Sequence, residues 1–262
     1  MEFKLLLQID RKFGDNLPFN YQYEQSAVIY RILSQADDRY SSWLHENGYV
    51  LNGKKRFKLF SYSPFIFERV RAVPRAGCLN VVGNYAVWYI NFIPEKSTAD
   101  FIKGVFEHKS FTIGDKAFKV AFNIIGVESL PPTSVSKEMR FRAMSPVCVK
   151  LHDGKRTNYL SPDNPLFAEG VLKGILSKYE SYHGTPYPDE DVCQQMQFSL
   201  MEGAMVKSKL ITIKADTPNA TKVKGYLFSF RMKMPAELMK IAIEGGIGEE
   251  CSQGFGFIKA TR

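Results

Sequence analysis

The sequence predicts an α+β protein of 262 residues, built from two tandem ferredoxin-like (RRM-like) domains, each with the element order βαββαβ. Three observations lead to this prediction. Short runs of apolar, aromatic and β-branched residues alternate with amphipathic helical patterns. The order of these elements in the first half recurs in the second half. A polar segment with two adjacent prolines separates the halves, which gives a first domain at 1–128, a linker at 129–136 and a second domain at 137–262.

Four strands and three helices are expected in the first domain. A strand over 2–9 is followed by a helix over 24–36, whose apolar residues fall on one face. Asp37 or Asp38 can cap a second, short helix that ends near Gly48. The remaining elements are strands at 58–67, 78–93 and 118–124 and a helix that starts at Ser97 or Thr98.

The second domain repeats this order with different residues. Its expected strands are 139–150, 197–214, 222–234 and 255–261. Its expected helices are 164–180, where apolar residues recur at helical spacing, and a helix that begins at Pro235 and ends near Glu244. Since the halves share element order rather than residue identity, the pattern indicates a repeated fold.

The charge of the chain suits a polyanionic partner. Lys and Arg total 35 against 27 Asp and Glu, which gives a net charge of +8 and a pI near 9.2. Up to residue 130 there are 17 basic and 13 acidic residues, and after it 18 and 14, so each half carries +4 and there is no basic tail. The cluster of Lys54, Lys55, Arg56 and Lys58 fits either RNA binding or an ordinary solvated face.

Several classes of site and location are not indicated. Cys78, Cys148, Cys193 and Cys251 are far apart, without a CxxC pair or a histidine at ligand spacing, which argues against a zinc site and a disulfide framework. The acidic run at 189–191 lacks a second carboxylate cluster, so a two-metal nuclease is not expected. The sequence contains neither a membrane-spanning stretch nor a signal-peptide pattern. We therefore expect a cytoplasmic protein without metal, cofactor or membrane contact.

The segment 245–256, GGIGEECSQGFG, contains five glycines between a helix and the last strand. Glycine permits positive φ and lets backbone amides approach a bulky or anionic partner. The segment is not a P-loop, because no GK[ST] follows, and not a dinucleotide fingerprint, because the helix precedes the strand. An irregular turn without a ligand is the competing interpretation, but five glycines and two adjacent acids are many for a simple connection. The glycines that we nominate for RNA binding are Gly245, Gly246, Gly248, Gly254 and Gly256.

Motifs spread over the whole chain resemble one family, the CRISPR-associated repeat-specific endoribonucleases. The most specific is GGIGEECSQGFGFIKA at 245–260, which is similar to the glycine-rich signature of that family. The resemblance continues in LPFNYQYEQSAVIY (17–30), WLHE (43–46), KLFSYS (58–63) and FRAMSPVCV (141–149). It implies two ferredoxin-like domains and an enzyme that excises guide RNAs from a long precursor transcript.

The resemblance also implies cleavage without a metal ion, because the nucleophile is the substrate's own ribose 2′-OH. Its attack on the adjacent phosphorus leaves a 2′,3′-cyclic phosphate and a 5′-OH. Carried over by motif, the catalytic residues are Tyr30 at the end of VIY, His45 in WLHE and Lys58 at the start of KLFSYS. His45 would protonate the leaving 5′-oxygen or remove the 2′-proton. Tyr30 would orient the 2′-OH, and Lys58 would neutralise charge on the pentacovalent phosphorus.

Helical geometry supports two of these assignments. At 100° per residue, Tyr30 lies about 130° from the apolar stripe of its helix and should be free to meet a ligand. On the short helix, Tyr40, Trp43 and Leu44 should point inward, with His45 turned about 150° away. A surface histidine, a boundary tyrosine and a strand-edge lysine would give the same pattern, so the family motifs decide between the two interpretations.

Further basic residues fall on alternate positions of strands in the second domain. Arg140, Arg142, Arg231 and Lys233 would share one face of a sheet, where they could line an RNA groove or form a solvated surface. The expected partner is CRISPR repeat RNA, with subunits of a CRISPR effector complex as further candidates, and the protein is expected to be a monomer or homodimer. A non-catalytic RNA-binding subunit and an effector-complex backbone protein are the competing interpretations.

Overall fold

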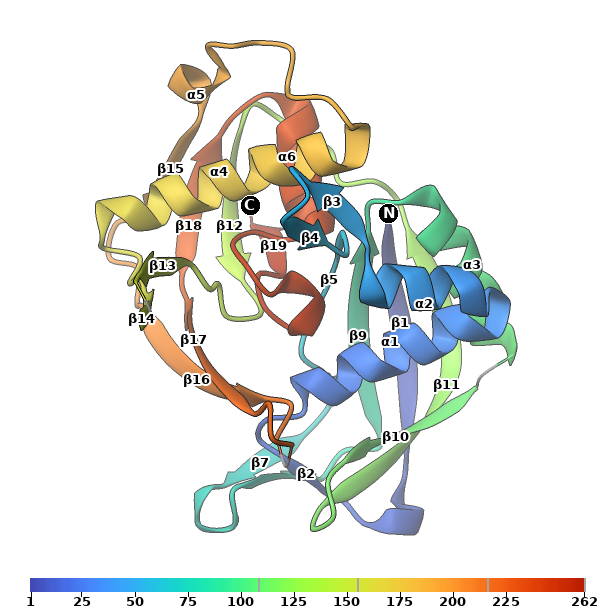
Figure 1. Cartoon of the computed structure of the whole chain (residues 1–262). Coiled ribbons are helices and arrows are strands. Elements are labelled where there is room, and N and C mark those ends of the chain that lie inside the picture. The colour runs from blue at the N-terminus through green and yellow to red at the C-terminus, as the bar shows by residue number, and fades with distance from the viewer. Residues whose placement is uncertain (108, 155, 216, 262) are drawn as a thin grey trace.

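The structure, a computed structural model, describes residues 1–107, 109–154, 156–215 and 217–261 (Figure 1). The main strands of its first half are β1 (Glu2–Asp10), β5 (Phe60–Tyr62), β9 (Tyr85–Phe92), β10 (Ser110–Gly114) and β11 (Lys119–Leu130). The helices there are α1 (Gln22–Ala36), α2 (Asp38–Glu46) and α3 (Glu95–Glu107). Short strands join these elements: β2 (Asn16–Pro18), β3 (Tyr49–Leu51), β4 (Lys55–Phe57), β6 (Ile66–Phe67), β7 (Val70–Val73) and β8 (Cys78–Val81).

The second half has a similar plan with two added hairpins. Its sheet strands are β12 (Glu138–Ala143), β15 (Gln197–Leu200), β18 (Ser229–Lys233) and β19 (Ile258–Thr261), and its helices are α4 (Pro165–His183), α5 (Val192–Gln195) and α6 (Ala236–Gly245). The hairpins are β13 (Lys150–Asp153) with β14 (Arg156–Tyr159), and β16 (Lys207–Ile213) with β17 (Thr221–Leu227).

Both main sheets have the ferredoxin-like strand order, which confirms the predicted fold class. The first sheet runs β10-β11-β1-β9-β5, and the second runs β15-β18-β12-β19. In the first sheet β1, the first strand of its unit, lies between β11 and β9, and β5 lies beyond β9; β10 is an additional edge strand. In the second sheet β12, the first strand of its unit, lies between β19 and β18, and β15 lies beyond β18. All the pairings in the two sheets are antiparallel. A βαββαβ chain gives this order when both helices pack on one face.

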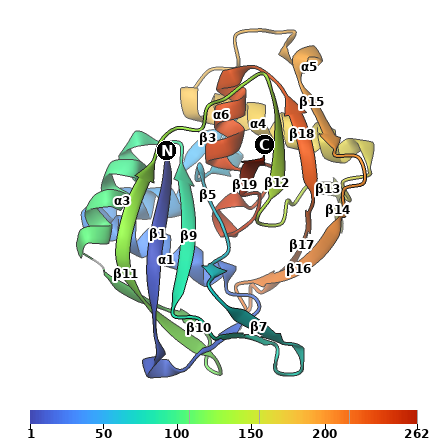
Figure 2. The ribbon, with the colours of Figure 1, turned by 180° about the vertical axis from the view of Figure 1, so that it is seen from behind.

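Helices cover one face of each sheet and leave the other face open. In Figure 1, α1 and α2 lie in front of β1 and β9, and α4 crosses in front of β12 and β18. Seen from behind in Figure 2, the strands lie in front of these helices. The open faces of the two sheets therefore point to the same side of the molecule, away from α1, α2 and α4.

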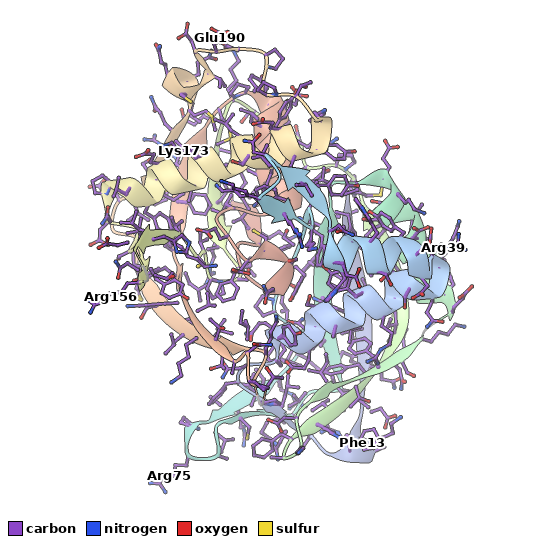
Figure 3. All side chains as sticks on the ribbon, viewed as in Figure 1. Phe13, Arg39, Arg75, Arg156, Lys173 and Glu190 are labelled. Atoms are coloured by element: carbon purple, nitrogen blue, oxygen red, sulfur yellow. The ribbon has the colours of Figure 1, made fainter. Side chains whose placement is uncertain are left out.

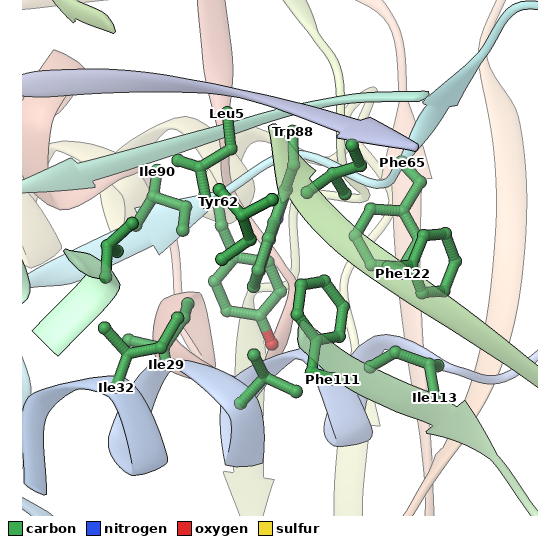
Figure 4. Close-up of a cluster of buried hydrophobic side chains, with 14 of the residues drawn as sticks. Leu5, Ile29, Ile32, Tyr62, Phe65, Trp88, Ile90, Phe111, Ile113 and Phe122 are labelled. Carbon is green, nitrogen blue, oxygen red and sulfur yellow. The ribbon is translucent and has the colours of Figure 1, made fainter. Parts of the chain in front are cut away.

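The chain has two main hydrophobic cores, and the second contains residues from both halves. The first lies between the first sheet and α1, where Trp88, Phe111 and Phe122 pack with Ile29 and Ile32 (Figure 4). All its buried members come from residues 3–124. The second consists of residues 141–258 together with two from the first half, Leu59 and Ile93. The halves are thus joined by apolar burial as well as by the linker.

Several predicted strands are shorter than the sequence suggested. The predicted strand 58–67 contains β5 and β6, which are separated around Pro64, and the predicted strand 139–150 ends at Ala143, before Pro146. Proline removes a backbone donor, so neither ladder can continue through it. The prediction for 197–214 merged β15 and β16, which lie in different sheets. β11 extends to Leu130, two residues into the predicted linker.

Candidate active site

His45 projects from the last turn of α2, and its side chain is exposed, as predicted. The helix begins at a cap in which the side chain of Asp37 accepts a hydrogen bond from the Tyr40 amide at 2.9 Å. It ends where the amide of Gly48, at φ 63°, donates to the carbonyl of Trp43. Leu44 is buried in the first core, and His45, turned 100° from it around the helix, is exposed.

Tyr30 contacts His45 but is not free, which corrects the sequence prediction. The two rings meet edge to face with centroids 4.9 Å apart. The tyrosine ring also packs against Phe60 of β5, with centroids 5.6 Å apart, so it is half-buried at the edge of the first core. Helical periodicity could not reveal this contact, because it describes α1 alone and Phe60 lies on another element. Burial raises the pKa of Tyr30 well above its ordinary value, so the hydroxyl stays protonated at neutral pH.

Lys58 reaches the same place from the segment that joins β4 to β5. Its Nζ donates to the carbonyl oxygen of His45 at 2.6 Å, and Arg56 donates to the carbonyl of Glu46 at 3.0 Å. Both cations therefore satisfy the free carbonyls at the C-terminus of α2. Burial, with a smaller contribution from the nearby Arg56 charge, lowers the pKa of Lys58 to about 8.

The residue after Lys58 fixes its position between the two halves. Leu59 has φ 55°, a left-handed conformation that costs energy for a residue other than glycine. Its side chain is buried in the second core, and its carbonyl accepts a hydrogen bond from the Ile93 amide at 3.0 Å. The strained backbone sends Leu59 into one core and Phe60 into the other, while Lys58 stays at the surface between them.

Trp43 was expected to point inward, but its side chain is 39% exposed. It lies against Tyr40, with ring centroids 5.7 Å apart, and meets the edge of Tyr49 at 5.4 Å. The prediction of burial was correct for Tyr40 and Leu44. The error arose because Trp43 lies at the margin of the helix face, where a large ring packs without being covered. An exposed indole two residues from His45 offers a surface on which a nucleobase can stack.

A positively charged groove of about 540 Å³ opens beside Lys58. The β4–β5 segment, α4, β13 and the glycine-rich segment form its walls. Two carboxylates line it, Glu249 and Glu250. Its basic lining residues are more numerous: Lys55, Arg56, Lys58, Lys150, Lys173 and Lys178. Such a groove attracts phosphate groups.

The glycine-rich loop, residues 245–256, packs closely against both halves, and all five of its glycines are buried. A Cβ on Gly254 (φ 93°) would lie 2.5 Å from the Cβ of Gln22 on α1. A Cβ on Gly248 (φ 71°) would lie 2.4 Å from the Cys148 carbonyl oxygen. Both backbone angle and space therefore require glycine here. That Gly245, Gly246, Gly248, Gly254 and Gly256 bind RNA stays a prediction.

The four basic residues predicted on the second sheet do share its open face. Arg140 and Arg231 stand directly opposite each other on β12 and β18, and both are exposed, as are Arg142 and Lys233. Like charges in directly opposed positions destabilise a sheet, so an anionic ligand would offset this cost. Arg231 also pairs with Glu138 at 3.2 Å. Because this face is open on the side away from α2, the structure does not bring these residues to His45 (Figure 2).

Sequence reasoning missed a group of exposed lysines on the β16–β17 hairpin, which lie on both of its faces because Lys209 pairs with Gly225 and Lys224 pairs with Leu210. Ile211, Ile213 and Val223 anchor this hairpin in a small apolar cluster. Its exposed lysines are Lys207, Lys209, Lys214, Lys222 and Lys224. The signal was present in the sequence as lysines two residues apart in both strands, a spacing that places them on one side of each strand.

The described part of the chain shows no group of three or more His, Cys, Asp and Glu side chains placed to hold a metal ion. Among the same residues, no helix has the length and apolar character needed to span a bilayer. Cys78, Cys148, Cys193 and Cys251 are free thiols. The functional groups that meet beside α2 are the imidazole of His45, the hydroxyl of Tyr30 and the ammonium of Lys58.

Two family models match the chain. Residues 16–122 match the family described as CRISPR-associated protein Cas6, N-terminal, and residues 130–260 match CRISPR associated protein Cas6, C-terminal. Together they cover most of both ferredoxin-like units, without β1, and include the three proposed catalytic residues and the glycine-rich loop.

Similar proteins and structures carry related descriptions. CRISPR-associated endoribonuclease Cas6 1 of Methanocaldococcus jannaschii is 25% identical over 98% of this chain and 92% of its own length. CRISPR-associated endoribonuclease Cas6 of Pyrococcus furiosus is 26% identical over 95% of this chain and 85% of its own. A solved structure described as an RAMP protein binding different RNA substrates superposes with a TM-score of 0.81 at 20% identity, over the full length of both chains. A Cas6-related structure from Pyrococcus furiosus gives 0.80 at 22% identity, over 100% of this chain and 98% of the other.

Proposed function

The chain belongs to the Cas6 family, and from this premise we propose that it is an endoribonuclease that cuts CRISPR repeat RNA to release guide RNAs. The names of its relatives support an RNA-cleaving activity. The observation that carries the proposal is the convergence of three residues from different segments. Tyr30 lies within ring contact of His45, and Lys58 is hydrogen-bonded to the backbone of His45.

The reaction is transesterification within the RNA. The ribose 2′-oxygen attacks the adjacent phosphorus and passes its proton to water, and the bond to the 5′-oxygen of the next nucleotide breaks as that oxygen takes a proton from the protein. The products are a 2′,3′-cyclic phosphate and a 5′-OH. No metal ion is needed to generate the nucleophile, because it is already in the substrate; the protein must orient it and protonate the leaving oxygen.

His45 acts as the general acid that protonates the leaving 5′-oxygen. Its position at the C-terminus of α2 favours a cationic side chain, and its exposure lets an RNA strand reach it. The imidazole carries N–H groups that can be transferred to an oxygen within hydrogen-bond distance, as a general acid requires. General acid catalysis of this kind contributes on the order of 10²- to 10⁴-fold to a rate.

Tyr30 and Lys58 support the transfer in different ways. Because burial raises the pKa of Tyr30, its hydroxyl donates a hydrogen bond and orients the 2′-OH rather than removing its proton. Lys58 uses one hydrogen on the His45 carbonyl and has two left to offer a phosphate oxygen. With a pKa of about 8, its ammonium is present at pH 7 and stabilises charge on the pentacovalent phosphorus.

The RNA follows the basic surfaces. The groove beside Lys58 holds the phosphates next to the cleavage position. Arg140, Arg142, Arg231 and Lys233 bind a more distant segment on the open face of the second sheet. Because the helices separate this face from His45, an RNA that contacts both sites has to pass around the edge of the molecule (Figures 1 and 2).

Incubation of the purified protein with its repeat RNA in EDTA tests this function. The expected products carry a cyclic phosphate and a 5′-OH, and a substrate with 2′-hydrogen at the cleavage position should stay intact. His45→Ala should bind the RNA with unchanged affinity but should cut it about 10³-fold more slowly. His183→Ala is the matched control, since that histidine stacks on Tyr179 and does not contact Tyr30.

Cleavage of the deoxy substrate would contradict the 2′-OH mechanism, and full activity of His45→Ala would contradict the role of His45. Unchanged binding without any cleavage by the wild-type protein would leave a non-catalytic RNA-binding subunit as the function. The same assay therefore separates the two interpretations.

A further inference from the structure

Lys178 is a lysine of α4 whose side chain is almost completely buried, at 3% exposure. Its Nζ donates to the carbonyl oxygens of Gly246 at 2.6 Å, Gly245 at 3.2 Å and Gly248 at 3.3 Å. It also donates to Sγ of Cys251 at 3.2 Å. The three hydrogens of an ammonium group thus serve four acceptors, all of them in the glycine-rich loop.

Lys178 differs from the other lysines of α4 and of the groove. Lys150 pairs with Glu249 and Glu250, and Lys173, one turn and a half earlier on α4, pairs with Glu169. Within the described part of the chain, Lys178 has only backbone carbonyls and a thiol as partners. Burying an amino group in this way is costly, and an apolar side chain would fill the same space at lower cost. Its presence needs a reason other than general stability.

The reason lies in the backbone of the loop. Gly246 and Gly248 have φ of 73° and 71°, so the chain is neither helix nor strand and its carbonyls have no ladder to join. Gly245 is the last residue of α6, where carbonyls are left without intrahelical donors. Buried carbonyls need partners, and one side chain supplies them for three residues. Lys178 is therefore the internal support of the loop.

The loop that Lys178 supports lies against the segment that carries Lys58. Ser61, three residues after Lys58, donates from Oγ to the carbonyl of Glu244 at 3.3 Å. A Cβ on Gly246 would lie only 3.0 Å from the Cβ of Ser61. Lys178 itself lines the groove that opens beside Lys58. A change in loop shape would thus alter both the groove and the support of β5.

We propose that Lys178 is a positioning residue for RNA cleavage: it holds the glycine-rich loop in the shape that keeps the groove open and keeps β5, with Lys58, in place beside His45. The proposal rests on the proposed function for its effect on cleavage. Its effect on the loop itself is independent of that function, so the two can fail separately.

The test compares Lys178→Met with Lys240→Met, an exposed lysine of α6 that does not line the groove. Hydrogen–deuterium exchange of the full-length protein without RNA is the first readout. In Lys178→Met, amides of 246–256 should exchange about 10-fold faster or more, as expected when local opening becomes easier. Amides of β1 and β11 should be unchanged, and Lys240→Met should match the wild type throughout.

RNA assays are the second readout. Lys178→Met should lower kcat/KM for repeat RNA by about 100-fold, the scale of a displacement near 1 Å at a catalytic group, and should raise the Kd for RNA. Lys178→Arg keeps the charge and the donors, so it should restore loop protection and activity in part. If the loop exchanges faster in Lys178→Met but the wild-type protein does not cleave RNA, the proposed function is refuted and the structural role of Lys178 remains.

Two outcomes overturn the proposal. One is a folded Lys178→Met whose loop amides exchange at wild-type rates, or whose loop loosens while cleavage and binding stay unchanged. The other is global unfolding of both Lys178→Met and Lys178→Arg, which would make Lys178 a part of the second core with no specific effect on the loop.

Discussion

The catalytic corner, formed by Tyr30, His45 and Lys58, and the glycine-rich loop differ in how their residues act. In the catalytic corner His45 is exposed and Tyr30 and Lys58 are half-buried, and a ring contact and a hydrogen bond connect the other two to His45. In the loop, the glycines are buried and the backbone fits against both halves. The corner therefore depends on side-chain chemistry, and the loop depends on backbone shape.

This difference teaches which substitutions each region tolerates. Truncation of an exposed side chain in the corner removes a chemical group with little loss of packing. Addition of a single methyl group in the loop forces the backbone to move, because the space is occupied by main chain or core atoms. Truncation of His45 should therefore lower activity without lowering stability, and a change in the loop should lower both.

The largest expected effect on activity comes from His45→Ala. Removal of the general acid should lower the single-turnover rate constant by about 10³-fold. The midpoint of thermal unfolding should change little, because the side chain is exposed. If the melting temperature fell together with the rate, His45 would contribute to stability, as the loop does, and its role as general acid would be contradicted.

The largest expected effect on stability comes from Gly248→Ala. The new Cβ would meet the carbonyl of Cys148 at 2.4 Å and would hold φ in the left-handed region. Gly154→Ala is the matched control, since Gly154 also has positive φ but has nothing within 4 Å of its Cβ position. Urea unfolding should show a loss of about 3 kcal/mol for Gly248→Ala and about 1 kcal/mol for Gly154→Ala. Equal losses would show that conformational strain, and not close approach, is why the loop needs glycine.

The pH dependence of cleavage should reveal Lys58. Because its pKa is lowered to about 8 and the proton is needed, its contribution is present below pH 8 and is lost as pH rises above it. The rate should therefore fall by an additional factor of about 10 per pH unit above 8. Lys58→Arg keeps its charge throughout and should lack this break. A break at the same pH in Lys58→Arg would assign it to another group.

The smallest effect is expected on the open sheet face. Arg140→Ala and Arg231→Ala should each weaken RNA binding by a factor of about 5 to 10 and reduce its salt dependence by about one phosphate contact. Arg75→Ala, at a loop far from both the corner and the second sheet, is the control (Figure 3). Cleavage at saturating RNA should stay the same. A reduced rate at saturation would mean that this face takes part in positioning the cleavage site.

The fold and the position of His45 could be predicted because they depend on local periodicity. The spacing of Leu44 and His45 on one short helix decides which is buried, whatever the rest of the chain does. The contact of Tyr30 with Phe60 could not be found in this way, since the two residues come from different elements. The same is true of Leu59, which enters the core of the other half, and of Lys178, whose four acceptors lie about seventy residues away.

The most direct test of the central claim, proton donation by His45 to the leaving oxygen, uses a repeat RNA in which sulfur replaces the 5′-oxygen at the cleavage position. A thiolate leaves without a proton, so the acid is no longer needed. His45→Ala should cut this substrate at close to the wild-type rate while remaining about 10³-fold slower on normal RNA. An equal defect on both substrates would contradict the claim and would show that His45 does not protonate the leaving group.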